Sequence, residues 1–188
     1  SISVVICCYN SEKKIEQTLL HLAKQNLEPS TVTEIVLVDN NSTDQTVVKA
    51  RSIWQDANST IPLIIVHEPT AGLSHARKAG IDHSRHDYIV FCDDDNWLDE
   101  NYLQTVLVCF NDNPSIAIIG GVGNAVFENQ KPWWFDFFCH GYAVGEQLPK
   151  AGYLDSVYGA GMGIRRNVVT SKSFSNLPLL LTDRKGRE

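Results

Sequence analysis

The chain of 188 residues has 22 acidic and 16 basic side chains, and its net charge of -6 gives no attraction toward nucleic acid or an anionic membrane. Its 43% apolar content suffices for one buried core, so we expect a single domain over residues 1–188. No apolar run reaches the roughly 18 residues of a membrane span, and the five cysteines lack metal-ligand spacing. We therefore expect reduced thiols and a cytoplasmic location.

Apolar strands alternate with amphipathic helices along the first two thirds of the chain. Ile2–Cys8 is rich in β-branched residues and predicts a buried strand. From Glu12 to Gln25 the apolar residues fall on one helical face. The segments that follow are strand Glu34 to Val38, a helical pattern from Val47 to Trp54, strand Pro62 to His67, helix Leu73 to His83, strand Tyr88 to Cys92, helix Glu100 to Phe110 and strand Ile116 to Val122.

This alternation predicts an α/β fold, with a mostly parallel central sheet and helices on both faces. In such sheets, ligands bind at the carboxyl ends of the strands. From Phe127 onward the sequence becomes irregular, aromatic and glycine-rich, so we divide the domain into residues 1–125 and 126–188.

Three adjacent carboxylates, Asp93, Asp94 and Asp95, follow the fourth predicted strand. Such charges repel one another unless a cation lies among them. Mg²⁺ and Mn²⁺ bind carboxylate oxygens and complete their shells with substrate phosphates, so Asp93 and Asp95 suit a metal–diphosphate site. The alternative is an acidic cap for a following helix, because acidic side chains stabilise helix N-termini.

Polar residues at two other strand ends favour the metal–diphosphate site over the helix cap as the interpretation of the acidic triplet. Cys8, Tyr9 and Asn10 end the first strand, and Asp39 ends the second, at the same edge of the sheet. The Asp39 carboxylate could accept a hydrogen bond from the N3–H of a uracil, while Tyr9 offers a ring and Asn10 an amide. The alternative for Asp39 is an Asx turn that closes the strand.

A glycine and an arginine stand at the start of the third predicted helix. Gly72 permits an unusual backbone turn, and Arg77 could reach a diphosphate or the acidic triplet. The alternative for Arg77 is a solvated charge on the helix surface, like its neighbour Lys78. His75 and His83 have no partner motif and are interpreted as ordinary polar residues.

Four segments resemble successive motifs of family 2 glycosyltransferases: Val4–Asn10, Glu34–Asp44, Ala71–Gly80 and Phe91–Trp97. They stand in the order of the family and cover about the first half of the chain. The resemblance implies a GT-A fold, a nucleotide-diphosphate sugar donor, most simply a UDP sugar, and inversion at the anomeric carbon. Residues 1–125 would form the donor half, and residues 126–188 the acceptor-side half.

The resemblance also implies roles for single residues. Donor binding falls to Cys8, Tyr9, Asn10, Glu12, Asp39, Asn41, Gly72, Arg77, Asp93 and Asp94, and a Mn²⁺ or Mg²⁺ ion to Asp93 and Asp95. Two departures from the family pattern are visible. Cys7 and Cys8 stand where a proline-containing turn is common, and Asn40 stands where a second aspartate is common.

The second half of the chain offers acceptor-side residues. Aromatic rings concentrate from Gln130 to Phe138, Trp133 and Trp134 among them, and could form a small core, which we prefer, or stack on sugar faces. Gly159, Ala160 and Gly161 open a segment that resembles the family's glycine-rich acceptor-side motif, in which small residues let the backbone approach the transferred sugar. We expect a saccharide or lipid-linked acceptor.

An inverting transfer needs a base that takes the acceptor proton. The resemblance implies an aspartate in an acidic pair after the glycine-rich segment. Asp183 is followed by Arg184 and matches poorly, and Asp155 precedes the glycines. We therefore expect a truncated catalytic domain whose base lies beyond Glu188, in a longer protein that could associate with the inner face of the cell membrane.

Other classes of protein remain open. A sugar nucleotidyltransferase would also use a metal and an α/β sheet, but it should carry a glycine-rich, basic phosphate loop where Tyr9, Asn10 and Ser11 stand. A nucleotide-sugar-binding module or pseudoenzyme would share every donor-site feature. An NAD oxidoreductase is disfavoured, because the glycines at 159–163 lack the dinucleotide-binding spacing.

Overall fold

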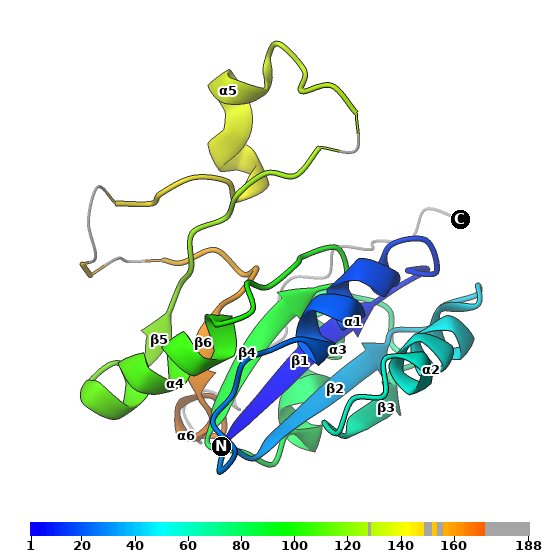
Figure 1. Cartoon of the computed structure of the whole chain (residues 1–188), viewed down its shortest axis with the longest axis horizontal. Coiled ribbons are helices and arrows are strands. Elements are labelled where there is room, and N and C mark those ends of the chain that lie inside the picture. Colours follow the sequence, from blue (N-terminus) through cyan, green and yellow to red (C-terminus); the bar gives the residue numbers. More distant parts are fainter. Residues whose placement is uncertain (128, 149–151, 154–155, 172–188) are drawn as a thin grey trace.

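A six-stranded sheet in the order β3-β2-β1-β4-β6-β5 runs through the protein. The computed structural model describes residues 1–127, 129–148, 152–153 and 156–171. The parallel strands are β1 (Ile2–Cys8), β2 (Thr33–Asp39), β3 (Leu63–His67) and β4 (Tyr88–Asp93). The short strands β5 (Ile118–Ile119) and β6 (Gly163–Arg165) complete the sheet, β6 running antiparallel to both of its neighbours (Figure 1).

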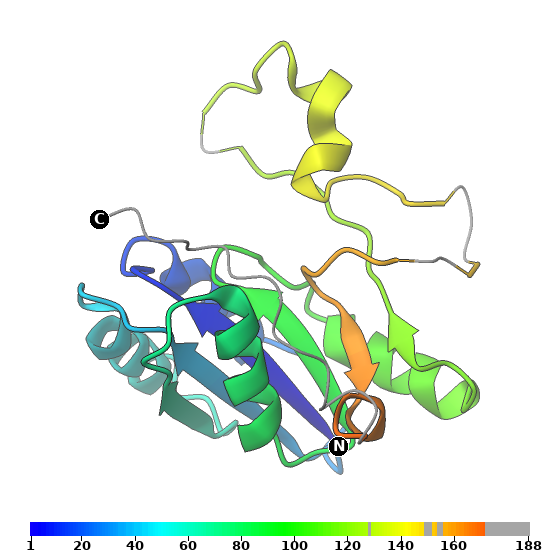
Figure 2. The same ribbon diagram turned by 180° about the vertical axis from the view of Figure 1, so that it is seen from behind.

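Helices cover both faces of the sheet. On one face lie α1 (Ile15–Ala23), α2 (Thr46–Asp56) and α4 (Tyr102–Asp112). On the other lie α3 (Leu73–His83) and the short α6 (Arg166–Val169), which are in front in the reverse view (Figure 2). The α/β fold predicted from the alternation of strands and helices is therefore confirmed.

Two apolar layers hold these helices to the sheet. Leu19 of α1, Trp54 of α2 and Phe110 of α4 pack against the first face. On the second face, Gly80 of α3 lies so close to Val5 of β1 that a Cβ atom there would meet the valine Cγ1. Because β1 and β2 are buried from both sides, the central residues Val4–Cys8 and Ile35–Val38 are uniformly apolar rather than alternating.

Most predicted elements differ from the structure by one or two residues at an end, and two differ by more. The first helix begins at Ile15 rather than Glu12, because the Ser11 carbonyl accepts the amide hydrogens of Lys14 and Ile15. The strand predicted over Ile116 to Val122 is wrong in its length, since β5 has two residues. It lies at the sheet edge and pairs with a three-residue strand, so that few ladder bonds are available to extend it.

Beyond β5 the chain leaves the body of the protein and returns at β6. An isolated bridge joins Gly123 to Gly145, and between them lie α5 (Phe135–Phe138) and the 3₁₀ helix η1 (Cys139–Tyr142), which stand away from the sheet (Figure 1). We name residues 131–142 the aromatic arm. Neither of its helices contains a buried residue. Among the described residues, no helix is long and apolar enough to cross a membrane.

Candidate functional site

The carboxyl ends of β1, β2 and β4 meet at a cavity of about 330 Å³. It is lined by Cys7, Cys8, Tyr9, Lys14, Asn40, Leu73, Ala76 and Asp94. We name it the strand-end pocket. It brings together three of the residues predicted to bind the donor, Cys8, Tyr9 and Asp94, and adds five that were not predicted.

The acidic triplet divides between the two faces of the sheet. Asp94 accepts a hydrogen bond from the Ser11 hydroxyl and lies 3.6 Å from the Lys14 ammonium on the α1 side. Asp93 is the last residue of β4 and faces the charge of Arg77 on α3. Asp95 is exposed in the following turn. The triplet therefore does not cap a helix: α4 begins only at Tyr102.

The negative charge around Asp93 is only partly balanced. Burial raises the pKa of the Asp93 carboxyl above its ordinary value, Arg77 counteracts this, and the charges of Asp95 and Asp94 add to it. Carboxylates whose charge is unbalanced in this way suit a hard cation such as Mg²⁺ or Mn²⁺. Among the described residues, however, no three His, Cys, Asp or Glu side chains are grouped as metal ligands. Any ion held here would need further oxygen ligands beyond those of the described residues.

Asp39 ends β2 beside Cys8 and is 7% exposed. One carboxylate oxygen accepts the Ser42 amide hydrogen at 3.1 Å, three residues further along the chain rather than the two of an Asx turn. The other lies 3.2 Å from Nδ1 of His67, at the end of β3. Each carboxylate oxygen can accept two hydrogen bonds, so these contacts leave Asp39 able to accept another.

Two predicted donor-binding residues support the loops around the pocket. Asn10 has a left-handed backbone with φ 51°, and its side-chain oxygen accepts the Thr43 amide hydrogen at 2.8 Å. The Glu12 carboxylate accepts the Gln45 amide hydrogen at 3.3 Å, just before α2. Asn41, with φ 61°, is an exposed turn residue. None of the three lines the strand-end pocket.

Asn40 joins the end of β2 to the start of α3. Its side-chain amide donates to the carbonyl oxygens of Glu68 at 3.0 Å and Thr70 at 2.6 Å, and its oxygen accepts the Gly72 amide hydrogen at 2.9 Å. Gly72 itself has φ 134°, a conformation that favours glycine. Asn40, which is 1% exposed, thus fixes the wall of the pocket that Leu73 and Ala76 form.

Arg77 and the glycine-rich segment meet beside β4. The Arg77 guanidinium lies over the Phe91 ring, 5.5 Å from its centroid. Gly161, with φ 75°, donates its amide hydrogen to the Phe91 carbonyl at 2.9 Å and accepts the Tyr102 hydroxyl at 2.6 Å. Gly159, Ala160 and Gly161 therefore run along the end of β4, next to Asp93.

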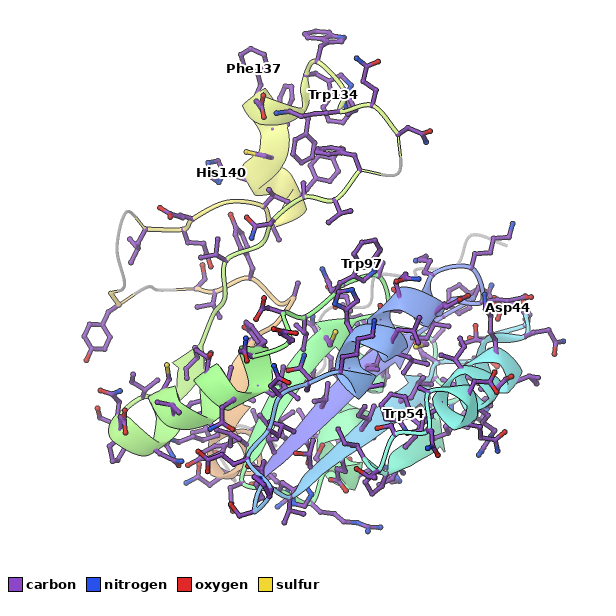
Figure 3. The ribbon with its side chains drawn as sticks, viewed as in Figure 1. Asp44, Trp54, Trp97, Trp134, Phe137 and His140 are labelled. Atoms are coloured by element: carbon purple, nitrogen blue, oxygen red, sulfur yellow. The ribbon has the colours of Figure 1, made fainter. Side chains whose placement is uncertain are left out.

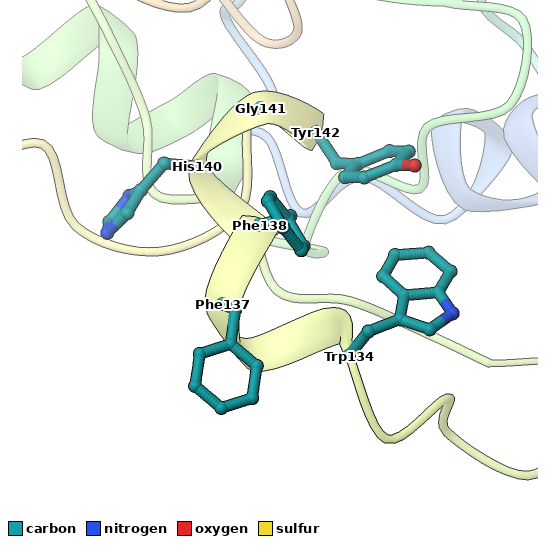
Figure 4. Close-up of a pocket in the computed structure, with 6 residues that line it drawn as sticks. All are labelled: Trp134, Phe137, Phe138, His140, Gly141 and Tyr142. Carbon is teal, nitrogen blue, oxygen red and sulfur yellow. The ribbon is translucent and has the colours of Figure 1, made fainter.

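The aromatic arm carries a second, more open hollow of about 710 Å³, lined by Trp134, Phe137, Phe138, His140, Gly141 and Tyr142 (Figure 4). Trp134 and Tyr142 project to one side of the turn, with ring centroids 6.1 Å apart. Trp133 and Phe137 are 85% and 77% exposed. The preferred interpretation of the segment as a small core is therefore wrong for these two rings. Trp97, beyond the triplet, lies on the side of the body that faces the arm (Figure 3).

The cysteines of the pocket are not reactive nucleophiles. All five cysteines are free, and burial raises the pKa of Cys7 to about 12 and that of Cys8 also well above its ordinary value. Both thiols thus stay protonated at neutral pH and line the pocket as small apolar groups.

Sequence reasoning missed Lys14, Ser11 and Asn40. Lys14 stands four residues after Asn10, and its position close behind a strand end was the only signal that could have found it. Ser11 and Asn40 act through backbone groups and carboxylates far away in the sequence. Asp183 and Asp155, considered above as bases, lie outside the described residues.

A mostly parallel sheet with polar and charged side chains gathered at the carboxyl ends of its strands belongs to the class of α/β domains that bind ligands at that edge. Residues 3–171 match the family "Glycosyl transferase family 2". The chain belongs to this family.

Individual relatives agree with this assignment. The chain is 24% identical over 177 residues to a "Glucosyl-dolichyl phosphate glucuronosyltransferase" of Haloferax volcanii, covering 89% of this chain and 53% of that protein. Its fold is similar to that of residues 1–349 of S. aureus TarS in complex with UDP, with a TM-score of 0.67 and 23% identity over 90% of this chain and 48% of that one.

A mannosyltransferase of Pyrobaculum calidifontis in complex with GDP-Man and Mn²⁺ has a TM-score of 0.59 and 25% identity, over 65% of this chain and 35% of that one. The GT-A fold expected from the sequence is thereby confirmed. The chain spans about half the length of the first two proteins.

Proposed function

We propose that this chain is the donor-binding part of an inverting glycosyltransferase that takes a sugar from a nucleoside diphosphate, with UDP as the favoured nucleotide and Mn²⁺ or Mg²⁺ as cofactor. The observation that carries the proposal is the strand-end pocket, where Tyr9, Lys14 and Asp94 converge from β1, α1 and β4. Related structures contain UDP or GDP-Man, which supports a nucleotide diphosphate as the ligand class.

In this proposal the acidic triplet holds the metal through Asp93 and Asp95. The donor set is purely carboxylate, which suits Mn²⁺ and Mg²⁺, and phosphate oxygens and water supply the remaining ligands. Mn²⁺ in the Pyrobaculum complex supports the choice of ion. The ion would stabilise the departing diphosphate, and Lys14 and Arg77 would add positive charge on the two sides of the sheet.

Base recognition falls to Asp39 and Tyr9. Tyr9 is 42% exposed at the mouth of the pocket, so its ring is accessible for stacking on a base. Asp39 retains capacity to accept the N3–H of uracil. A cytosine lacks that hydrogen, so the carboxylate also supplies a reason for uracil selectivity.

We propose that the acceptor binds on the side of the glycine-rich segment. Gly159, Ala160 and Gly161 run beside the end of β4, and the exposed Trp133 and Trp134 of the arm offer rings that could stack on a sugar face. We propose a saccharide or lipid-linked acceptor. The relative from Haloferax volcanii, named for a glucosyl-dolichyl phosphate, supports the lipid-linked alternative.

Calorimetry with UDP, GDP and CDP, each with and without Mn²⁺, tests the proposal. We expect the tightest binding for UDP with Mn²⁺. Asp93→Ala and Asp95→Ala should remove the dependence on Mn²⁺, and Asp39→Ala should remove the preference for UDP over CDP. Glu100→Ala, which removes an exposed carboxylate five residues after Asp95, is the control and should change neither.

Two results would contradict the proposal. The first is that none of the three nucleotides binds under either condition. The second is that binding of UDP persists unchanged in both Asp39→Ala and Asp95→Ala.

A further inference from the structure

The Arg77 guanidinium occupies a narrow slot between β4 and the glycine-rich segment. It lies over the Phe91 ring, whose centroid is 5.5 Å from the Arg77 Cζ. It also lies close to Gly159. A Cβ atom built on Gly159 would lie 2.7 Å from Nη2 and 3.6 Å from Cζ of Arg77. The guanidinium therefore fills the volume that a side chain at position 159 would take.

Backbone conformation does not explain the glycine at this position. Gly161 and Gly145 have φ values of 75° and 95°, whereas Gly159 is not in the left-handed region and an alanine could adopt its backbone angles. The space at position 159 is instead taken by Arg77, so a larger residue there would have to move the guanidinium.

The wall that carries Gly159 is fixed to the sheet. The Gly161 amide donates to the Phe91 carbonyl at 2.9 Å, the Phe91 amide donates to the Met162 carbonyl at 2.9 Å, and the Met162 amide donates to the Gly159 carbonyl at 3.2 Å. The same strand supplies Phe91 to the slot and Asp93 to the site. Since the wall is fixed and the arginine side chain is flexible, an added methyl group would displace the guanidinium.

We propose that Gly159 is a positioning residue: its missing side chain leaves the slot that the Arg77 guanidinium fills, near the end of β4 and with its charge directed at the diphosphate of the donor. This rests on the proposed function. It adds a task on the donor side to the proposed place of Gly159 beside the acceptor. The Phe91 ring face also supports the guanidinium.

Binding of UDP in the presence of Mn²⁺ tests the slot, with uridine as the probe that lacks phosphates. We expect Arg77→Ala to weaken UDP binding about tenfold, as for the loss of a charge-assisted hydrogen bond. Gly159→Ala should weaken UDP binding about threefold or more in the parent chain but have no effect in the Arg77→Ala background, because the displaced group is then absent. Neither change should alter uridine binding.

Two control variants accompany this cycle. Lys78→Ala removes the neighbouring positive charge, which is exposed and paired with Asp82, and should leave UDP binding unchanged. Gly141→Ala adds a methyl group where no atom lies within 4 Å and should also leave it unchanged. A Gly159→Ala effect that is equally large in the Arg77→Ala background, or equally large for uridine, would overturn the proposal.

Thermal unfolding of the parent chain, Arg77→Ala, Gly159→Ala and the double variant, without nucleotide, separates the slot from the proposed function. Gly159→Ala should raise the melting temperature more in the Arg77→Ala background than in the parent chain, because only there does the methyl group fit without displacing Arg77. Equal changes in both backgrounds would contradict the slot itself. If the two substitutions change the melting temperature non-additively but UDP does not bind, the slot exists. In that case its role in donor binding and the proposed function are both wrong.

Discussion

The strand-end pocket and the aromatic arm differ in how firmly the rest of the protein holds them. Pocket residues follow strands that are buried on both faces, and Asn40 alone makes three hydrogen bonds to one loop. The arm contains six aromatic residues within positions 133–142, yet neither of its helices buries a side chain. Apolar content alone therefore does not indicate where a core lies, and identical substitutions should have very different effects in the two regions.

The largest contrast is expected between two phenylalanines. Phe110 of α4 is 1% exposed and stacks on Tyr88 at 4.7 Å, so Phe110→Ala should cost about 3–5 kcal/mol of unfolding free energy. Phe137 of the arm is 77% exposed, and Phe137→Ala should change the stability by less than about 0.5 kcal/mol. Urea unfolding of both variants measures the difference. Similar losses would show that the arm packs against something in solution.

A second contrast is expected when a neutral side-chain amide is replaced by a charged carboxylate at two neighbouring positions. Asn40→Asp would set a carboxylate against the carbonyl oxygens of Glu68 and Thr70, at a cost of about 3 kcal/mol. Asn41→Asp adds the same charge one residue later, at an exposed position, and should be nearly neutral. Urea unfolding at pH 7 compares the two variants. If they are equally stable, the hydrogen bonds of Asn40 do not hold the loop.

This result would also explain a departure from the family pattern. The resemblance to the family implies an aspartate at position 40, but the carbonyl groups of Glu68 and Thr70 that Asn40 contacts are acceptors. Only an amide can donate to both of them and accept from Gly72 at the same time.

A third contrast is expected when one methyl group is added to a glycine in each region. Gly80→Ala would place a Cβ against Val5 of β1 and should cost about 1–3 kcal/mol through overpacking. Gly141→Ala in the arm meets no atom within 4 Å and should be neutral or slightly stabilising. Thermal melting of both variants provides the comparison, and a neutral Gly80→Ala would mean that α3 can shift on the sheet.

The sequence was sufficient for features that depend on local periodicity. The alternation of apolar strands with amphipathic helices predicted β1 to β4 and the edge at which Tyr9 and Asp94 meet. It overextended β5, because the length of an edge strand depends on its partner, and β6 offers only three residues.

Features that depend on contacts between residues far apart in the chain could not be predicted from the sequence. Asn40 acts through three backbone groups of the loop at 68–72, which come together only in the fold. Gly159 is explained by Arg77, from a different element of the chain. The aromatic composition of the arm fits a core as well as a surface, and only the exposure of Trp133 and Phe137 distinguishes them.

The smallest predicted effect is a gain in stability rather than a loss, and it concerns Asp93 in the candidate site. Burial and the neighbouring carboxylates raise the pKa of Asp93 in the folded protein. Between this raised pKa and the usual value for aspartate, the folded state binds more protons than the unfolded state, so stability rises as the pH falls. The ionised Asp93 therefore destabilises the protein without ligand at neutral pH.

Asp93→Asn removes this charge and should raise the melting temperature at pH 7 by roughly 2 °C. The gain should disappear below the usual aspartate pKa, where both states are protonated. Asp95→Asn, at an exposed position, is the control and should show a smaller change. A stabilised Asp93→Asn protein that no longer binds UDP with Mn²⁺ would show that the site retains an unfavourable charge for its ligand. An Asp93→Asn protein less stable at pH 7 would instead mean that Arg77 outweighs the burial of Asp93.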